Sequence, residues 1–169
     1  MNNNAEYWIE KLNMAEHPEG GYFASAYRSP EQVRRDCLPS RFPGDRPAVS
    51  CIYYLLKKEQ FSAFHRLKSV EIWNFYTGSS LILHILDGQG NLLERKLGIN
   101  IGEGELPQTV IEPGCWFGAI IDGPQEFSLI GCTVVPGFDY EDFEIAGRKD
   151  LVACYPRHRA IIERLTRVE

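Results

Sequence analysis

Between residues 48 and 136, apolar and polar positions alternate in short runs that are rich in Val, Ile, Tyr, Phe and Trp. Runs of this kind, separated by Gly, Pro and other turn residues, are typical of β-strands. They predict strands at 48–56, 61–67, 70–76, 80–86, 92–97, 108–112, 115–121 and 127–135. The clearest hairpin joins 80–86 to 92–97 through Asp87-Gly88-Gln89-Gly90-Asn91, whose residues tolerate positive φ. Many short strands predict a sandwich or barrel, of which the jelly roll is one form.

The pattern at both ends of the chain favours helices. Residues 5–14 place Trp8, Ile9 and Leu12 on one face at helical spacing. Pro156 opens a second amphipathic segment that runs to about residue 166.

Between the first helix and the β region, residues 22–28 predict one more strand, and the proline-rich, charged stretch 29–47 predicts a surface loop. The expected fold is therefore mainly β, as one domain over residues 1–169 with a β core at 48–136 and short helical flaps at the termini.

Composition and charge narrow the class of protein. A chain of 169 residues fits one domain, and its net charge of −5 with a single basic doublet, Arg34-Arg35, argues against nucleic-acid binding. The start of the chain lacks the features of a signal peptide, and no apolar run approaches the roughly 20 residues that span a bilayer. We therefore expect a cytoplasmic protein that binds neither nucleic acid nor a membrane.

The five cysteines do not form a recognisable framework. Their number is odd and no two lie close in sequence, which argues against disulfides and zinc knuckles. Cys51, Cys115 and Cys132 lie in apolar runs and are expected to be small buried hydrophobic residues.

The segment FSAFHRLKSVEIWNFYTG (61–78) carries the most chemical information. Strand alternation places His65 with Ala63 and Leu67 on one face, and Glu71 with Trp73 and Phe75 on a face of the next strand. A turn at Lys68-Ser69 would bring both faces to the same interior. The sequence therefore predicts an imidazole and a carboxyl group in one apolar, aromatic-lined cavity.

At these residues the sequence resembles the cupin superfamily. The first cupin motif has a His-x-His pair, then a Glu and a Gly, and His65, Glu71 and Gly78 stand at matching spacing, with Leu67 in place of the second His. The second motif centres on Pro-Gly followed by His, and here Pro113-Gly114 is followed by Phe117 at that position.

Further strings resemble one uncharacterised single-domain cupin family with an RmlC-like jelly roll. They are HPEGGYF (17–23), AYRS (26–29), IYYLL (52–56), FSAFHRLKSVEIWNFYTG (61–78), PGCWFGA (113–119) and VVPGFDYEDFE (135–144). The resemblance covers residues from about 5 to 165 and implies a double-stranded β-helix barrel and a homodimer. It implies no particular reaction.

The resemblance bears on metal binding through the histidines that are missing. A full cupin site uses three His and one Glu around a divalent transition metal, and this chain keeps His65 and Glu71. Gln108 is a candidate third ligand. A metal held by these residues would be bound weakly, so one hypothesis is a metal-dependent enzyme with an incomplete site.

The favoured hypothesis needs no metal. His65 would act as a general base oriented by Glu71, with Tyr53, or else Tyr54 or Tyr76, as a general acid. This arrangement is similar to that of the dTDP-sugar epimerases, so the expected ligand is a nucleotide-sugar-like or other polar ring metabolite. The alternatives are a purely structural His65, or a non-catalytic sensor or storage-like dimer.

Other residues are candidate ligand contacts. Glu19 precedes Gly20-Gly21, which allows a sharp bend, and Arg28 could bind a carboxylate or phosphate. The alternative is an N-terminal strand that crosses to a partner subunit, with Arg28 in an ordinary ion pair. Trp73 and Phe117 are candidates for a stacking wall. Further aromatic and acidic residues lie at 138–144. Phe138 is a further candidate contact, and the acidic cluster of Asp139, Glu141, Asp142 and Glu144 is expected to be a solvated turn or helix cap, or else to close one mouth of the barrel.

Dimerisation is predicted through an outer sheet face, either the Ile52/Tyr54 side or the Ile72/Asn74/Tyr76 side.

Overall fold

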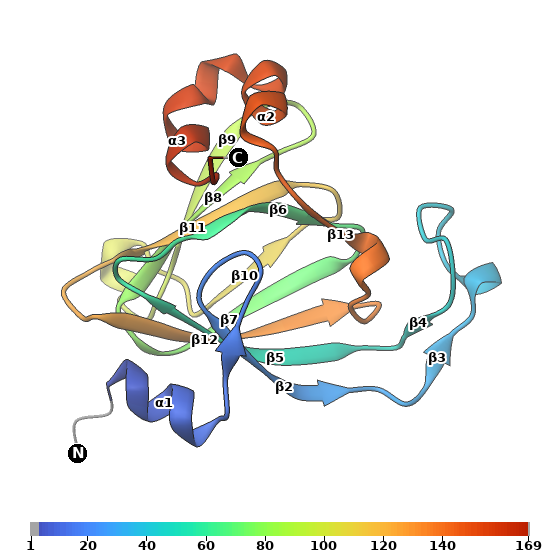
Figure 1. The fold of residues 1–169 in the computed structure, drawn as a ribbon, viewed down its shortest axis with the longest axis horizontal. Helices are drawn as coiled ribbons and strands as arrows, with labels where there is room; N and C mark the ends of the chain where they lie inside the picture. The colour runs from blue at the N-terminus through green and yellow to red at the C-terminus, as the bar shows by residue number, and fades with distance from the viewer. Residues whose placement is uncertain (1–3, 169) are drawn as a thin grey trace.

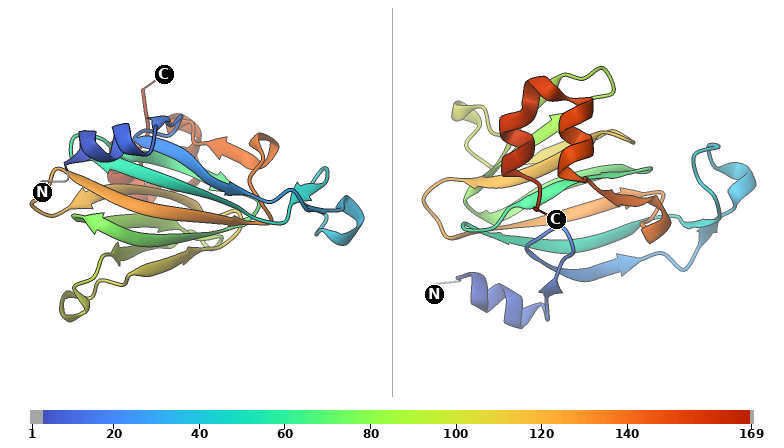
Figure 2. Two further views of the ribbon diagram at one scale, coloured as in Figure 1. Left: turned by 90° about the horizontal axis from the view of Figure 1, so that it is seen from below. Right: turned by 45° about the horizontal axis from the view of Figure 1, so that its top comes forward.

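The computed structural model describes residues 4–168 and contains two β-sheets packed face to face (Figures 1 and 2). The first sheet has the strand order β1 (Ala15–Glu16), β2 (Tyr22–Arg28), β5 (Ser50–Lys57), β12 (Phe127–Val135), β7 (Val70–Gly78) and β10 (Gln108–Ile111). The second has the order β13 (Phe143–Ile145), β6 (Ser62–Leu67), β11 (Trp116–Asp122), β8 (Ser80–Leu86) and β9 (Leu92–Leu97). Neighbouring strands in both sheets run antiparallel. The mainly β jelly-roll class is as predicted.

The main hydrophobic core lies between the two sheets. It joins Tyr54 and Trp73 of the first sheet to Leu83 and Phe117 of the second. Two smaller clusters lie outside the sheets. One packs α2 (Arg148–Cys154) and α3 (Arg159–Arg164) on the second sheet, and the other packs α1 (Ala5–Lys11) on the first (Figure 1). The terminal helices therefore cover opposite outer faces of the sandwich.

The strand pattern of the sequence matches the structure closely. Strands β2, β8, β9 and β12 have the predicted bounds, and the β8–β9 hairpin is confirmed. Asp87 stabilises its turn, because Oδ1 accepts hydrogen bonds from the backbone N–H groups of Gln89 and Asn91, at 2.9 and 2.8 Å. The predicted helix at 5–14 ends earlier, at Lys11, because Asn13 adopts a left-handed φ of 50°.

Several elements were not predicted. They are the short strands β1, β13, β3 (Gln32–Val33) and β4 (Arg46–Pro47), the helix α2, and the single-turn helices η1 (Arg35–Cys37), η2 (Ile101–Glu103) and η3 (Tyr140–Asp142). The helical segment predicted from Pro156 to about 166 is present as the single-turn helix η4 (Pro156–His158) followed by α3. Residues 29–47, expected to be a surface loop, form an arm that carries the β3–β4 pair and projects from the sandwich (Figure 1). Phe42 and Arg46 of this arm are buried, so the arm is packed against the body of the protein.

The two sheet faces proposed for dimerisation differ in the structure. The expectation that Ile52 and Tyr54 face outward is wrong, because Tyr54 is buried in the main core and Ile52 packs against it. The other face is open to solvent, with Tyr76 52% exposed. A homodimer through the Ile72/Asn74/Tyr76 face stays a prediction, which sedimentation at micromolar concentration would test.

None of the helices formed by residues 4–168 is both long enough and apolar enough to cross a membrane.

Candidate functional site

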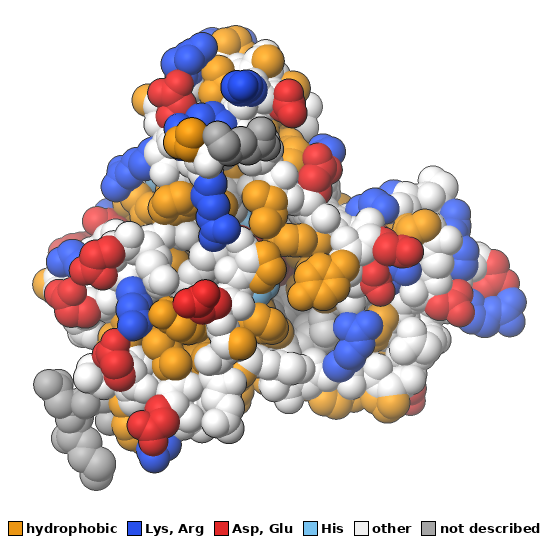
Figure 3. Space-filling model, in the orientation of Figure 1, with side chains coloured by type: hydrophobic (Ala, Val, Ile, Leu, Met, Phe, Trp, Pro, Cys, Tyr) orange, Lys and Arg blue, Asp and Glu red, His pale blue; other side chains and the backbone are white. Residues whose placement is uncertain are grey.

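A cavity of about 220 Å³ lies between the two sheets and is lined mainly by apolar side chains. The apolar lining comes from Phe23, Ile52, Leu67, Val134, Phe138 and Phe143. The polar lining includes Glu19, His65 and Glu71. The space-filling view shows hydrophobic side chains gathered around a hollow in the middle of one face of the molecule (Figure 3). The prediction that His65 and Glu71 share one apolar cavity therefore agrees with the geometry.

Glu19 reaches this cavity because of a sharp backbone turn at two glycines. Gly20 and Gly21 have φ values of +112° and +71°, which side-chain-bearing residues rarely adopt. A Cβ at Gly20 would lie 2.3 Å from the carbonyl oxygen of Phe61, so the turn also packs tightly against the barrel. The Tyr54 hydroxyl donates a hydrogen bond of 2.8 Å to the Gly20 carbonyl and stabilises the turn.

Glu19 and His65 form a buried pair. His65 Nε2 lies 2.9 Å from Glu19 Oε2, and the Ser62 hydroxyl donates to Glu19 Oε1 at 3.0 Å. The other ring nitrogen, Nδ1, lies 2.7 Å from the Ala63 carbonyl oxygen and donates to it. Both nitrogens of the imidazole are therefore engaged within the protein.

The charges of this pair favour an imidazolium and a carboxylate. Burial opposes the charged form of His65, but its attraction to Glu19 and the hydrogen bond between them outweigh burial and raise the pKa of the imidazole. Burial likewise opposes the charged form of Glu19, and His65 outweighs it, so the pKa of Glu19 is lowered. Each group thus stabilises the charged form of the other, and in that form their charges compensate each other.

Glu71 differs from Glu19 in having a free oxygen. Trp73 Nε1 donates a hydrogen bond of 2.9 Å to Glu71 Oε1, but Oε2 is buried and has no hydrogen-bond partner among residues 4–168. Burial, together with the nearby charge of Glu19, raises the pKa of Glu71 to about 7, despite the opposing effects of His65, Trp73 and the neighbouring Cys132 thiol. Glu71 therefore changes its protonation state near neutral pH, and one of its oxygens has no partner in the described chain.

The residues at the cupin metal position do not fit a metal ion. Both His65 nitrogens form hydrogen bonds within the protein, and Leu67 lines the cavity with an apolar side chain. The centroids of the Phe117 and His65 rings lie 4.1 Å apart. Within residues 4–168, no group of three or more His, Cys, Asp and Glu side chains is placed to hold a metal. The weak site of His65 and Glu71 is therefore two ligands short of the set that the cupin resemblance implies.

Trp73 and Phe117 lie behind the cavity wall. They share the interior face with His65 and Glu71 as predicted, but their side chains are 0% and 1% exposed and belong to the packed core. A stacking wall formed by these two rings is therefore wrong. Trp73 acts on the site through its hydrogen bond to Glu71, and Phe117 through its contact with the His65 ring.

Tyr53 and Gln108 lie away from the cavity. Because side chains alternate along β5, the inward position of Tyr54 places Tyr53 on the outer face, where its ring packs 6.1 Å from that of Tyr76. Gln108 is exposed on β10 and donates to the Asn74 side chain at 2.8 Å. Neither the role of Tyr53 as general acid nor that of Gln108 as metal ligand or ligand contact fits these positions.

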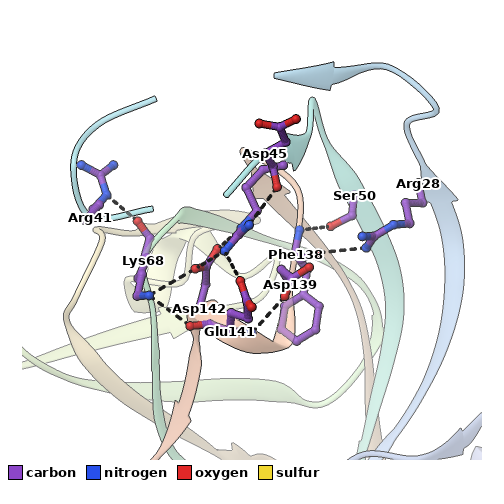
Figure 4. A network of polar contacts seen from close by, with 10 residues as sticks. Arg28, Arg41, Asp45, Ser50, Lys68, Phe138, Asp139, Glu141 and Asp142 are labelled. Atoms are coloured by element: carbon purple, nitrogen blue, oxygen red, sulfur yellow. Dashed lines mark hydrogen bonds and ion pairs between the residues drawn. The ribbon is translucent and has the colours of Figure 1, made fainter. Parts of the chain in front are cut away.

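Arg28 and Phe138, both predicted as ligand contacts, line the cavity. Arg28 is exposed, and its Nη1 donates a hydrogen bond of 2.8 Å to the Phe138 carbonyl (Figure 4). The Phe138 N–H donates to Ser50 Oγ at 2.8 Å, which ties the segment to β5. The two residues therefore mark the outer part of the cavity.

The covering segment, residues 138–143, lines this part of the cavity through Phe138, Tyr140 and Phe143. The four acidic residues do not line it, and Glu141 and Glu144 are exposed, as the first interpretation of the acidic cluster expects. Asp139 caps the η3 turn by accepting from Glu141 N–H at 3.0 Å. Asp142 is not solvated, since it is buried and forms a bidentate ion pair with Arg46 of the arm at 2.6 and 2.8 Å (Figure 4). The arm thus holds the covering segment in place.

His17 is a cavity residue that the sequence reasoning missed. Its Nδ1 lies 3.7 Å from Glu19 Oε2, and its ring packs edge-on against Phe23 and Tyr54. Burial lowers the pKa of His17 more than the attraction of Glu19 raises it. The signal for His17 in the sequence was its place in HPEGGYF, two residues before Glu19.

Comparison with known proteins shows similarity over nearly the whole chain. Residues 6–146 match the family described as Cupin superfamily (DUF985). The uncharacterised protein YML079W of Saccharomyces cerevisiae is 30% identical over 152 residues, covering 79% of this chain and 71% of that protein. The structure of protein SO0799 from Shewanella oneidensis is 38% identical, with a TM-score of 0.87 over 98% of this chain and 99% of that one. A hypothetical protein from Leishmania major is 35% identical, with a TM-score of 0.89 over 98% of this chain and 100% of that one.

Proposed function

This chain belongs to the cupin superfamily, in the family DUF985, and from that premise we propose that it binds a small molecule in its barrel and catalyses a proton transfer within it, without a metal. The observation that carries the proposal is Glu71, a residue of the cavity lining whose Oε2 is buried and has no hydrogen-bond partner among residues 4–168. A buried oxygen in this state is costly unless a ligand or water satisfies it.

Glu71 has the properties of a proton carrier. A general acid or base works best when its pKa lies near the working pH, and the pKa of Glu71 is raised to about 7. In the proposed reaction Glu71 accepts a proton from one position of the ligand and returns it to another position or face. The product is then an isomer or epimer of the substrate, and the reaction consumes no cofactor.

His65 takes a different role from the base that the sequence predicts. With Nδ1 on the Ala63 carbonyl and Nε2 on Glu19, the ring has no nitrogen free to accept a proton from a ligand. In this proposal His65 positions the site, because its two hydrogen bonds fix the ring and hold the buried Glu19 carboxylate beside the cavity.

The cavity volume narrows the class of ligand. Pockets for drug-sized molecules measure roughly 300–1,000 Å³, and this cavity measures about 220 Å³. The volume favours a molecule with one ring, or a branched chain of similar size, over a whole nucleotide sugar.

Deuterium exchange tests the proposal directly. A panel of single-ring hydroxy and keto compounds is first screened for a rise in melting temperature. Compounds that bind are then incubated with the protein in deuterium oxide and followed by NMR. We expect incorporation of deuterium at an acidic C–H position with the native protein and at least a hundredfold slower incorporation with Glu71→Gln, in line with the typical contribution of general acid–base catalysis.

The matched control is Glu112→Gln, which changes an exposed carboxyl group outside the cavity and should leave exchange unchanged. Binding without exchange would refute catalysis and support the non-catalytic sensor. Absence of binding by the whole panel would refute the proposed use of the cavity.

A further inference from the structure

We infer that the ligand of this cavity carries an anionic group, a carboxylate or a phosphate, which Arg28 binds at the outer end while the apolar remainder extends inward to Glu71. This inference rests on the proposed function, because it names the chemical class of the molecule that the same cavity binds.

Arg28 is the source of unbalanced positive charge in the cavity. Of residues 4–168, it is the only Lys or Arg in the lining. None of the carboxylates in the described chain forms an ion pair with it. The other charged groups in the lining are Glu19 and His65, which compensate each other as a close pair, and Glu71, which lies at the inner part of the cavity and forms no ion pair with Arg28. An anionic ligand group would therefore meet a cation that the protein itself leaves without a counter-charge.

The contacts of Arg28 leave its guanidinium available and orient it. Within the described chain, the guanidinium makes one hydrogen bond, in which Nη1 donates to the Phe138 carbonyl at 2.8 Å (Figure 4). A guanidinium carries several N–H donors in a planar fork that matches a carboxylate or phosphate. The bond to Phe138 holds the group beside the cavity and leaves the remaining donors for a ligand.

The rest of the lining sets the polarity along the cavity. Arg28 is exposed, whereas Glu71 is 6% exposed, so the two groups lie at the outer and inner parts of the same space. Between them the lining is mainly apolar and includes Phe23, Ile52 and Val134. A fitting molecule has an anionic end, an apolar body and, at its far end, a hydrogen-bond donor or acidic proton for Glu71.

A structural role for Arg28 makes a different prediction. If Arg28 served only to hold the Phe138 carbonyl, removing it would loosen the covering segment and weaken charged and neutral ligands alike. Loss of a binding site for the anionic group would weaken charged ligands alone. The comparison of a charged compound with a neutral compound of the same shape therefore separates the two roles.

The test uses calorimetric titration of the full chain with 4-hydroxybenzoate and with its neutral isostere 4-hydroxybenzamide, and phenyl phosphate tests the phosphate form. We expect the native protein to bind an anionic probe about tenfold more tightly than the benzamide, since a hydrogen bond to a charged group contributes about 1.5 kcal/mol or more. In Arg28→Gln this preference should disappear while the affinity for the benzamide is kept. Whichever of 4-hydroxybenzoate and phenyl phosphate binds more tightly identifies the anionic group as a carboxylate or a phosphate.

Arg41→Gln is the matched control. Arg41 is also an exposed arginine that donates to a backbone carbonyl, that of Lys68 at 2.7 Å, but it does not line the cavity. Its replacement should change neither affinity.

Equal binding of the charged and neutral probes by the native protein, or equal losses in Arg28→Gln, overturns the inference and leaves the proposed function standing. Failure of every probe, charged or neutral, to bind counts against both.

Discussion

Replacing Glu71 with Gln should stabilise the protein at alkaline pH and leave its stability almost unchanged at acidic pH. The Glu71 carboxyl group is buried, and its pKa is raised from 4.5 to about 7 in the folded chain. The folded state therefore holds the proton more tightly than the unfolded state does. The contribution of Glu71 to stability is therefore highest below pH 4.5, falls as the pH rises from there to about 7, and stays lowered above that value.

The size of the effect follows from the interval between the two pKa values. At about 1.4 kcal/mol per pH unit, the interval from 4.5 to about 7 corresponds to a cost of about 3 kcal/mol for ionising Glu71 in the folded protein. Gln has nearly the same shape, carries no charge, and keeps an oxygen to accept the hydrogen bond from Trp73. The variant therefore avoids this cost at alkaline pH.

Urea unfolding measures the difference. For a slope of about 2 kcal/mol per molar urea, the midpoint of Glu71→Gln should exceed that of the native protein by more than about 1 M near pH 8 and by little near pH 5. The amide group of this variant also places a polar group at the position of the unpartnered Oε2. Protonated Glu71 also places a polar group there. The difference between the midpoint shifts at the two pH values therefore reports the cost of ionising Glu71 alone.

Glu112→Gln again serves as the control, since Glu112 is exposed and its replacement should not change the pH dependence of unfolding. A Glu71→Gln variant that is no more stable than the native protein near pH 8, or equally stabilised at both pH values, would refute the argument. It would show that the ionised carboxyl group is not buried without a partner.

Two further predictions concern the elements that build the site. Glu19→Ala should destabilise the fold by about 3 kcal/mol, because it leaves the buried His65 without its counter-charge. The double variant Glu19→Ala/His65→Phe should regain part of this loss in urea unfolding, whereas additive losses would show that the pair is not coupled. Gly20→Ala should lower the melting temperature by several degrees, since its Cβ would lie 2.3 Å from the Phe61 carbonyl oxygen at a φ of +112°. Gly88→Ala, which meets no atom within 4 Å, is its control, and equal melting temperatures for the two variants would contradict the strain at Gly20.

Local patterns in the sequence were enough to predict most of the β core. Alternation over 80–86 and 92–97, with turn residues between them, defines both strands and their hairpin, because the information lies within one short segment. The same reasoning placed Glu71 and Trp73 on one face of β7, and the Trp73–Glu71 hydrogen bond agrees with it. The prediction missed β13 and α2, which lie at and after the end of the covering segment. Their sequences show neither a strong hydrophobic periodicity nor a clear helix-capping residue.

The prediction was wrong about which side chains of β5 point into the core, because this depends on how the sheet packs. The sequence of β5 shows two alternating sets of side chains, but it does not show which set faces the other sheet. Tyr54 and Ile52 turned inward and Tyr53 outward, the reverse of the expectation. Alternation determines which residues share a face, and packing between the sheets decides which face is buried.

By itself, the sequence determined that this protein is a β sandwich of the cupin type, that residues 65 and 71 face one interior, and that the usual metal-binding histidines are replaced by Leu67 and Phe117. Only the tertiary structure decided that Glu19, far before His65 in the chain, supplies its counter-charge, and that Glu71 keeps a free oxygen. Strand periodicity and motif spacing are local properties that a chain carries before it folds. The pairing of charges and the burial of one oxygen arise when distant segments meet. The turn at Gly20 and Gly21 can be expected from the sequence, but where it places Glu19 relative to His65 depends on the packing of those segments.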